Sequence, residues 1–330
     1  MKYDVTIIGS GPGGYVAAIR CAQLGMKTAL IEKYSTLGGT CLNVGCIPSK
    51  ALLDSSELYY NAKMRYAAHG INVHGLDINW PQMMSRKEKV IADTVAGIKY
   101  LMGKNKIDVY EGIGSFVNSG VVAVTKPDGR EERLETAKVV IATGSKPATL
   151  PFITLDKRRV ITSTEALSLD KIPGEMIIIG GGAIGLEMGS VYARLGTKVE
   201  VIEFMDSIIP TMDRTMGKEL QRSLQKIGMN FYLSHRVQSV KVNGNRVEVS
   251  AQNKAGDTVT FSADKCLVAV GRRPYSENLR LENTGVTVDQ RGFIQVNEHL
   301  ETRQPGIYAI GDVIGGAMLA HKAEEEGMYV

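Results

Sequence analysis

One local pattern occurs twice in this chain, and it strongly limits the folds that the chain can adopt. In its first occurrence, the apolar segment Lys2–Ile8 leads into the glycine-rich turn Gly9–Gly14. A helix over Tyr15–Leu24 and a strand over Lys27–Ile31 follow, and the acid Glu32 comes directly after that strand. This order predicts a βαβ unit whose first turn binds a dinucleotide.

The second occurrence repeats the same order more than 150 residues later. Its parts are a strand at Met176–Ile179, the turn Gly180–Gly185, a helix at Leu186–Leu195, a strand at Lys198–Ile202 and the acid Glu203. In both copies the acid lies 18 residues beyond the last glycine of the turn (14 to 32, and 185 to 203). Ligand-free glycine turns are a poor alternative, because the spacing to the acid is itself duplicated.

The ends of the two copies are also alike, which allows the domains to be outlined. An apolar strand stopped by Gly-x-x-Pro closes each copy, at Val139–Pro147 and at Leu267–Pro274. We therefore expect an α/β fold with two Rossmann-like dinucleotide-binding domains, one formed by residues 1–146 and 275–330 and the other by residues 147–274. A mostly helical insertion, near Cys46–Met102, enlarges the first copy.

Each turn should hold one dinucleotide, because its glycines let the backbone approach a pyrophosphate at a helix N-terminus. Glu32 and Glu203 should each accept hydrogen bonds from an adenosine ribose. Glu203 favours NAD over NADP, since its carboxylate would repel a 2′-phosphate and the next residues, Phe204-Met205-Asp206, include no arginine.

Composition excludes several other classes of protein. The net charge is only +4 and there is no basic tract, which argues against binding to nucleic acid. The uncharged, largely apolar stretch Val5–Ile19 is too short and too interrupted for a membrane helix, and the N-terminus has no secretory leader pattern. Four cysteines in 330 residues do not make a disulfide scaffold. We expect a cytoplasmic or mitochondrial-matrix location.

Cys41 and Cys46 lie in the segment Gly38–Lys50 and could form a metal half-site, a structural disulfide or a redox pair. A zinc site needs two more ligands, and neither Cys21 nor Cys266 has a metal-binding spacing. A redox pair fits best, because Cys46 precedes a predicted helix and Lys50 adds positive charge on the same face. Cys21 and Cys266 are expected to be buried small side chains, and no metal is expected.

Three weaker features have plain structural alternatives. Gly311-Asp312 follows a predicted strand and could bind a polyol, or could be a surface turn. Glu187 could act at a site or only complement the dipole of its helix. His321 is the least ordinary of the five histidines, whereas the segment Lys322–Glu326 is expected to be a solvated helix face.

Taken together, these residues resemble the flavoprotein disulfide reductases. The shared motifs are the two glycine turns, Gly-Gly-Thr-Cys-x4-Cys-x-Pro-x-Lys at 38–50, Ala-Thr-Gly at 142–144, Gly-Asp at 311–312 and the segment 318–327. The sequences of segments 41–50 and 318–327 are similar to those of the branch that oxidises protein-bound dihydrolipoamide with NAD. The resemblance implies a three-layer, glutathione reductase-like fold, with a lipoyl domain of a 2-oxo acid dehydrogenase complex or of the glycine-cleavage system as partner.

The resemblance also implies roles for individual residues. Cys41 would exchange with the substrate thiol, Cys46 would face the flavin, and Lys50 would pair with Glu187 beside it. FAD would lie against Gly9, Gly11, Gly14, Glu32, Lys33, Gly39, Thr40, Cys41, Lys50, Gly114, Thr143, Gly144, Ser145, Asp312, Met318, Leu319, Ala320 and His321. NAD would lie against Gly180, Gly182, Gly185, Glu203 and Gly271.

The chain departs from that family in one respect. The family's C-terminal dimerisation domain, with its histidine general base, has no counterpart in these 330 residues, so we expect a C-terminally truncated chain that is a monomer or a weak dimer, whereas the full-length parent would be a homodimer. A sibling disulfide or mercuric reductase, or a dinucleotide-binding fragment without disulfide turnover, remains an alternative.

Overall fold

The computed structural model describes residues 2–330, which pack into two compact units. The first unit comprises residues 2–43, 91–146 and 272–330, and the second comprises 44–90 and 147–271. The division between 146 and 147 coincides with the expected domain boundary. Residues 44–90 were expected in the first domain but group with the second unit, because helix α3 (Cys46–Met64) packs against α6 (Ala183–Arg194). The second unit also ends at 271, three residues earlier than expected.

The first unit is built on a seven-stranded sheet with the order β3-β2-β1-β6-β5-β4, to which β17 adds beside β6. Strands β3, β2, β1, β6 and β17 run parallel, whereas β4 and β5 are antiparallel to their neighbours. The strands of this sheet are β1 (Lys2–Ile8), β2 (Thr28–Glu32), β3 (Asp108–Glu111), β4 (Ile113–Asn118), β5 (Val121–Thr125), β6 (Glu131–Ile141) and β17 (Ile307–Ala309). Two further strands, β7 (Ser145–Pro147) and β16 (Arg272–Pro274), pair in a separate two-stranded sheet.

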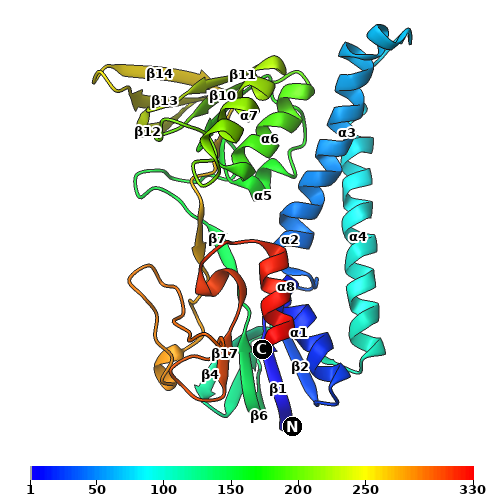
Figure 1. Cartoon of the computed structure of the whole chain (residues 1–330), viewed down its shortest axis with the longest axis vertical. Coiled ribbons are helices and arrows are strands. Elements are labelled where there is room, and N and C mark those ends of the chain that lie inside the picture. The colour runs from blue at the N-terminus through cyan, green and yellow to red at the C-terminus, as the bar shows by residue number, and fades with distance from the viewer. Residues whose placement is uncertain (1) are drawn as a thin grey trace. The chain divides into compact units, whose positions relative to one another are not determined.

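Two helices of the first unit lie side by side, α1 (Pro12–Gln23) and α8 (Ala320–Tyr329), as Figure 1 shows in blue and red. The other helical elements are α2 (Gly39–Val44), which reaches the boundary between the units, α4 (Trp80–Lys104), which crosses it, and the short 3-10 helices η2 (Leu281–Asn283) and η3 (Gly311–Ile314). Helix α1 begins at Pro12, three residues before the expected start, because proline is well tolerated in the first turn of a helix. It ends where Gly25 adopts a positive φ of 85°.

The second unit contains a five-stranded parallel sheet with the order β11-β10-β9-β15-β8. A separate antiparallel sheet has the strand order β12-β13-β14. The strands are β8 (Val160–Ile161), β9 (Glu175–Ile179), β10 (Lys198–Ile202), β11 (Met229–Tyr232), β12 (Arg236–Asn243), β13 (Arg246–Gln252), β14 (Thr258–Ala263) and β15 (Lys265–Val268). The helices are α3, α5 (Ser163–Ala166), α6, α7 (Arg214–Lys226) and η1 (Tyr66–His69).

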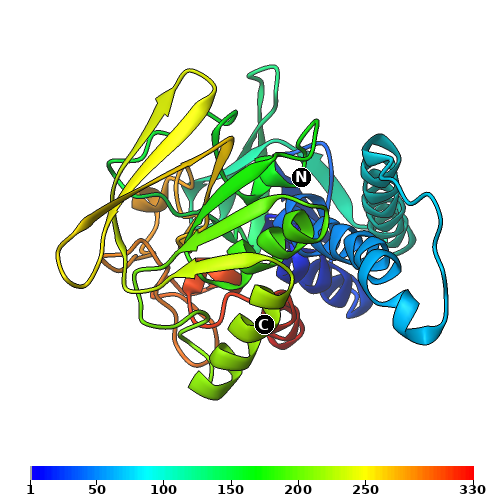
Figure 2. The same cartoon turned by 90° about the horizontal axis from the view of Figure 1, so that it is seen from above.

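The parallel sheet of the second unit is buried on both faces, which explains its continuous apolar strands. On one face, Ile178 of β9 and Val201 of β10 share a core with residues of α6, such as Val191. On the other face, Ile177 and Ile179 pack with residues of the antiparallel sheet. Figure 2 shows that sheet in yellow as a layer beside the green strands. The expected three-layer α/β arrangement is therefore present, and no helix within residues 2–330 is long and apolar enough to cross a bilayer.

Candidate functional site

The first glycine turn is closed tightly on one side and open on the other. Gly9 has a φ of +104°, and a Cβ there would collide with the carbonyl oxygen of Ala142 at the end of β6. A Cβ on Gly14 would collide with the carbonyl oxygen of Gly9. Nothing lies within 4 Å of a Cβ built on Gly11, which is the N-cap of α1. The turn thus leaves open space in front of a helix N-terminus, which suits a pyrophosphate.

Glu32 at the end of β2 is tied directly to this turn. Its Oε2 accepts hydrogen bonds from the backbone N of Ser10 at 2.9 Å and from the Ser10 hydroxyl at 2.6 Å, and its Oε1 accepts from the backbone N of Tyr34 at 3.1 Å. Glu32 is only 6% exposed. The carboxylate is therefore held in a fixed position beside the turn, where a ribose hydroxyl could still donate to it.

The second turn has the same geometry. Gly180 has a φ of +109°, and a Cβ there would collide with the carbonyl oxygen of Ala269, whereas a Cβ on Gly185 would lie 2.6 Å from the carbonyl oxygen of Gly180. Gly182, like Gly11, faces open space. The Glu203 carboxylate accepts from the backbone N of Gly181 at 2.5 Å and of Met205 at 2.7 Å. Each turn has the cradle that a dinucleotide needs.

The cysteine segment is anchored on the first turn. The backbone N of Gly38 donates to the carbonyl oxygen of Ser10 at 2.9 Å, and a Cβ on Gly39 would lie 2.6 Å from the Cα of Gly11. Cys41 follows on α2 and is half-buried. Burial, the Glu324 carboxylate and Cys41 together raise the pKa of Tyr15 on α1, which keeps that hydroxyl protonated.

Cys46 is the first residue of α3 and is exposed. A helix N-terminus favours the thiolate form of a cysteine. One turn later, Lys50 Nζ lies 2.7 and 2.9 Å from the two carboxylate oxygens of Glu187 on α6, and the Ser49 hydroxyl donates to the same carboxylate at 3.1 Å. Glu187 therefore has side-chain partners and does more than complement the dipole of its helix.

A polar cluster brings together the Gly-Asp segment and the first residues of β7 and β16. The Ser145 hydroxyl donates to Asp312 Oδ2, and Arg272 Nε donates to the Ser145 oxygen at 2.6 Å. The Arg272 guanidinium also lies 3.8 Å from Asp312 Oδ2. Asp312 is thus part of a built network and is not a residue of a simple surface turn. Arg272 was missed by sequence reasoning, and only its Gly-x-x-Pro context could have suggested it.

The other expected contact residues of the first unit lie on several elements. Thr143 donates its hydroxyl to the carbonyl oxygen of Tyr275 at 2.6 Å, and Lys33 Nζ lies 3.8 Å from the centre of the Tyr275 ring. A Cβ on Gly144 would meet nothing within 4 Å. Thr40 is exposed on α2, while a Cβ on Gly114 of β4 would lie 2.9 Å from the Ile8 side chain. Met318, Leu319, Ala320 and His321 form the approach to α8 and its first turn.

In the second unit, Gly271 follows β15 with a φ of +117° and also faces open space. The remaining cysteines are Cys21 and Cys266. Burial raises the pKa of Cys266 to about 12, and it raises the pKa of the half-buried Cys21 as well. Within residues 2–330 no group of three or more His, Cys, Asp or Glu side chains is arranged to hold a metal ion.

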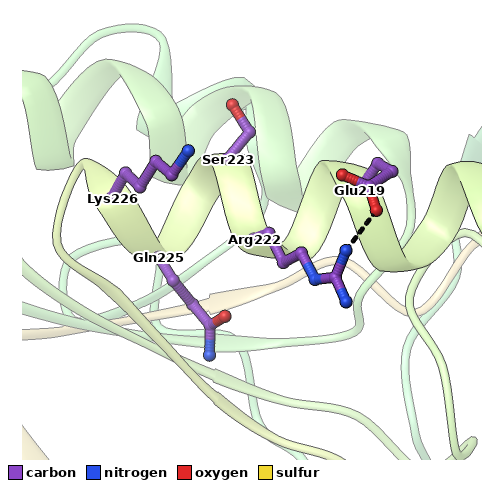
Figure 3. Close-up of a pocket in the computed structure, with 5 residues that line it drawn as sticks. All are labelled: Glu219, Arg222, Ser223, Gln225 and Lys226. Carbon is purple, nitrogen blue, oxygen red and sulfur yellow. Dashed lines mark hydrogen bonds and ion pairs between the residues drawn. The ribbon is translucent and has the colours of Figure 1, made fainter.

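A surface hollow of the second unit lies on the exposed side of α7 and is separate from the glycine turn. It is lined by Glu219, Arg222, Ser223, Gln225 and Lys226. Figure 3 shows the Arg222 guanidinium directed at the Glu219 carboxylate one turn earlier, which is an ordinary ion pair on a helix surface. All five side chains come from one helix, so this hollow offers no converging groups for catalysis.

Comparison with known proteins agrees with this geometry. A family model described as pyridine nucleotide-disulphide oxidoreductase matches residues 3–327. The chain is 48% identical to mitochondrial dihydrolipoyl dehydrogenase of Pisum sativum and to leghemoglobin reductase of Glycine max, covering 98% of this chain but 65% and 62% of those proteins. It is 44% identical to dihydrolipoyl dehydrogenase of Trypanosoma brucei brucei, covering 99% of this chain and 69% of that protein.

A solved structure is also similar. The copper(II) complex of the HOCl-induced flavoprotein disulfide reductase RclA from Escherichia coli superposes with a TM-score of 0.86 at 28% identity, over 99% of this chain and 69% of that one. The chain thus spans slightly less than two thirds of the pea and soybean proteins. Because the family model covers nearly all of its residues, the chain belongs to the pyridine nucleotide-disulphide oxidoreductase family.

Proposed function

We propose that this chain carries the dinucleotide and disulfide centres of a dihydrolipoyl dehydrogenase, the enzyme that oxidises protein-bound dihydrolipoamide to lipoamide with NAD. FAD would bind at the first glycine turn and NAD at the second. The partner would be a lipoyl domain of a 2-oxo acid dehydrogenase complex or of the glycine-cleavage system, in the mitochondrial matrix or the bacterial cytoplasm. The names of the pea and trypanosome relatives favour this member of the family.

The observation that carries this proposal is the attachment of the cysteine segment to the first glycine turn. Gly38 and Gly39 contact Ser10 and Gly11 through the backbone, and Cys41 follows within two residues. A redox pair that starts at the wall of a dinucleotide site is suited to exchange electrons with a cofactor bound there. A structural disulfide or a metal half-site would gain nothing from that position.

The residues would divide the chemistry as follows. A substrate thiolate attacks Sγ of Cys41 in the Cys41–Cys46 disulfide, which forms a mixed disulfide and releases Cys46 as a thiolate. The second substrate thiol then displaces Cys41, so the substrate leaves as a disulfide and both cysteines are reduced. The N-terminus of α3 stabilises the Cys46 thiolate, and the Glu187 carboxylate holds the Lys50 ammonium in place. When bound, FAD and NAD would supply the electron and hydride transfer that these side chains cannot perform.

The test is the visible spectrum of the purified protein during reduction. We expect a bound flavin and, after two-electron reduction, a long-wavelength absorbance that arises when a thiolate faces the flavin. Cys46→Ser should abolish that absorbance, whereas Cys21→Ser should leave it unchanged. A colourless protein, or an absorbance that survives Cys46→Ser, would refute the proposal.

Substrate comparison separates this enzyme from its siblings. Dihydrolipoamide should reduce the flavin faster than glutathione does, and NADH should reduce it faster than NADPH. Reduction by NADH without any reduction by thiols would instead favour a dinucleotide-binding fragment, which is the alternative suggested by the partial coverage of the relatives.

A further inference from the structure

Glu326 on α8 does not behave as a solvated surface residue, contrary to the expectation for the segment 322–326. Its side chain is only 15% exposed. Its Oε2 accepts a hydrogen bond from the backbone N of Gly311 at 2.7 Å, and its Oε1 lies 2.5 Å from Lys322 Nζ. The carboxylate therefore joins the last helix to the turn that begins η3.

Helix α8 is held firmly on α1, so Glu326 has little freedom to move. A Cβ on Gly327 would lie 2.6 Å from the carbonyl oxygen of Gly13, and a Cβ on Gly13 would lie 2.9 Å from the carbonyl oxygen of Ala323. The Tyr15 hydroxyl adds a hydrogen bond to Glu324 at 3.1 Å. Such close backbone contact, which Figure 1 shows as two adjacent helices, fixes the position of α8 along α1.

The turn bound by Glu326 begins at Gly311, which has an unusual backbone conformation. Gly311 has a φ of +75°, and a Cβ there would lie 3.2 Å from the Cβ of Ala323. The next residue is Asp312, whose carboxylate meets Ser145 and Arg272 on its other side. A bond to the Gly311 N–H therefore holds the backbone from which the Asp312 side chain projects.

We propose that Glu326 is a positioning residue for the flavin cofactor, acting through Gly311 to hold Asp312 toward the ribityl chain. This inference rests on the proposed binding of FAD in the first unit. It assigns to α8 a second role: besides covering α1, it couples the phosphate-binding turn at Gly11–Gly14 to the residue that would bind the polyol. Removing the carboxylate leaves the Gly311 N–H without its acceptor, while the phosphate turn keeps all of its own bonds.

The experiment measures the affinity of the flavin-free protein for two ligands. FAD binding is followed by flavin fluorescence and ADP binding by calorimetry. ADP occupies the same phosphate turn but has no ribityl chain, so it does not depend on Asp312. Glu326→Ala should weaken FAD binding by about tenfold, the usual effect of losing a charge-assisted bond to a buried donor, and should leave ADP binding unchanged within about twofold. Glu326→Gln should weaken FAD binding less than Glu326→Ala does, because the amide oxygen of glutamine can still accept a hydrogen bond from the backbone N of Gly311.

Glu325 offers a matched control, since it is the neighbouring acid on the same helix and is exposed. Glu325→Ala should leave both affinities unchanged. Equal weakening of FAD and ADP by Glu326→Ala, or no change in FAD affinity with either variant, would overturn the inference while leaving the proposed function in place. Failure of the unmodified protein to bind FAD would overturn both.

Discussion

The two glycine turns are nearly identical in their backbone bonds but differ in what lies next to them. Ser10 and Gly181 occupy equivalent positions, and each donates its N–H to the acid that ends the second strand. The carbonyl oxygen of Ser10 accepts from Gly38, whereas that of Gly181 accepts from Ile209. In the first unit this neighbour leads into the cysteine segment, while in the second it leads into α7. The same backbone arrangement thus lies next to the cysteine segment in the first unit and next to the chain that leads to α7 in the second.

The helix that follows each turn is also covered differently. In the first unit α1 packs against α8, and in the second α6 packs against α3. The first contact is made by glycines on both sides, whereas the second is made by larger side chains, such as Leu52 of α3 and Met188 of α6, which share one core. The first turn is therefore the more tightly constrained of the two, and variants can test that difference.

The largest effect on cofactor binding is expected from Gly14→Ala in the first turn. Gly185→Ala is the matched substitution in the second turn. The new methyl group would collide with the Gly9 carbonyl oxygen in the first turn, but would lie 2.6 Å from the Gly180 carbonyl oxygen in the second. We expect Gly14→Ala to lower FAD affinity by roughly 100-fold or more, and Gly185→Ala to retain FAD but lose rapid reduction by NADH. Flavin content and stopped-flow reduction measure the two effects. Gly97→Ala on α4, where a Cβ meets nothing, is the control, and full flavin content in Gly14→Ala would contradict the prediction.

A smaller and more selective effect is expected from Gly11→Ala and Gly182→Ala. A Cβ at either position meets no protein atom, so folding should be unaffected, yet the methyl group would stand where a phosphate approaches. We expect a loss of roughly tenfold in FAD affinity for the first variant and in NADH affinity for the second, with unchanged melting temperatures of the ligand-free proteins. If either variant weakened both cofactors equally, the assignment of one dinucleotide to each turn would be wrong.

Coenzyme choice distinguishes the two acids. Glu203→Gln removes the charge that disfavours a 2′-phosphate but keeps an oxygen that can accept from the backbone, so the preference for NADH over NADPH should fall by about tenfold. Glu32→Gln is the matched change in the first unit and should leave that ratio unaltered. Steady-state kinetics with both coenzymes provide the measurement, and equal rates with NADH and NADPH in the unmodified protein would contradict the role of Glu203.

The smallest effect concerns α7, the helix that replaces the cysteine segment in the second unit. Asp213 caps its N-terminus by accepting from the backbone N of Thr215 at 2.7 Å, and this bond lowers the pKa of the carboxyl group. A lowered pKa stabilises the fold above the unfolded value of about 3.9, and the benefit disappears as the pH falls through the folded pKa.

Asp213→Ala should therefore lower the melting temperature by a few degrees at pH 7 and by less near pH 3. Thermal unfolding followed by circular dichroism measures this difference. Asp206→Ala, which breaks only an exposed ion pair with Arg214, should change the melting temperature less. A destabilisation by Asp213→Ala that grew toward low pH would contradict the stabilising role of the ionised cap.

The sequence was sufficient to predict the duplicated turns, because glycine spacing and strand hydrophobicity are local signals. The helix starts were misplaced by three residues, at Pro12 and at Ala183, since residues of each turn already belong to the helix. The charged segment 322–326 predicts a solvated Glu326, whereas its partner, Gly311, lies 15 positions away in a turn with a positive φ. Its side-chain contact could not be read from the helical pattern alone.

Long-range packing explains the other differences. The segment 44–90 groups with the second unit through contacts of α3 with α6. The hydrophobic pattern of neither helix indicates that the two are in contact. Lys87 is an extreme case: it is 1% exposed and donates to the carbonyl oxygen of Leu167 at 2.6 Å. A lysine on a long amphipathic helix is expected at the surface, so only the three-dimensional arrangement reveals that it caps the end of α5.

The packing of α8 on α1 also bears on the order in which the chain can fold during synthesis. The first unit needs β17 beside β6 and Gly327 against Gly13, so it is complete only when nearly all 330 residues are available. The second unit ends at residue 271 and lies between segments of the first, so it can close earlier. The second unit could then fold while the strands of the first unit that are made early still lack their C-terminal partners. The first unit is therefore the part more exposed to misfolding and to chaperone binding.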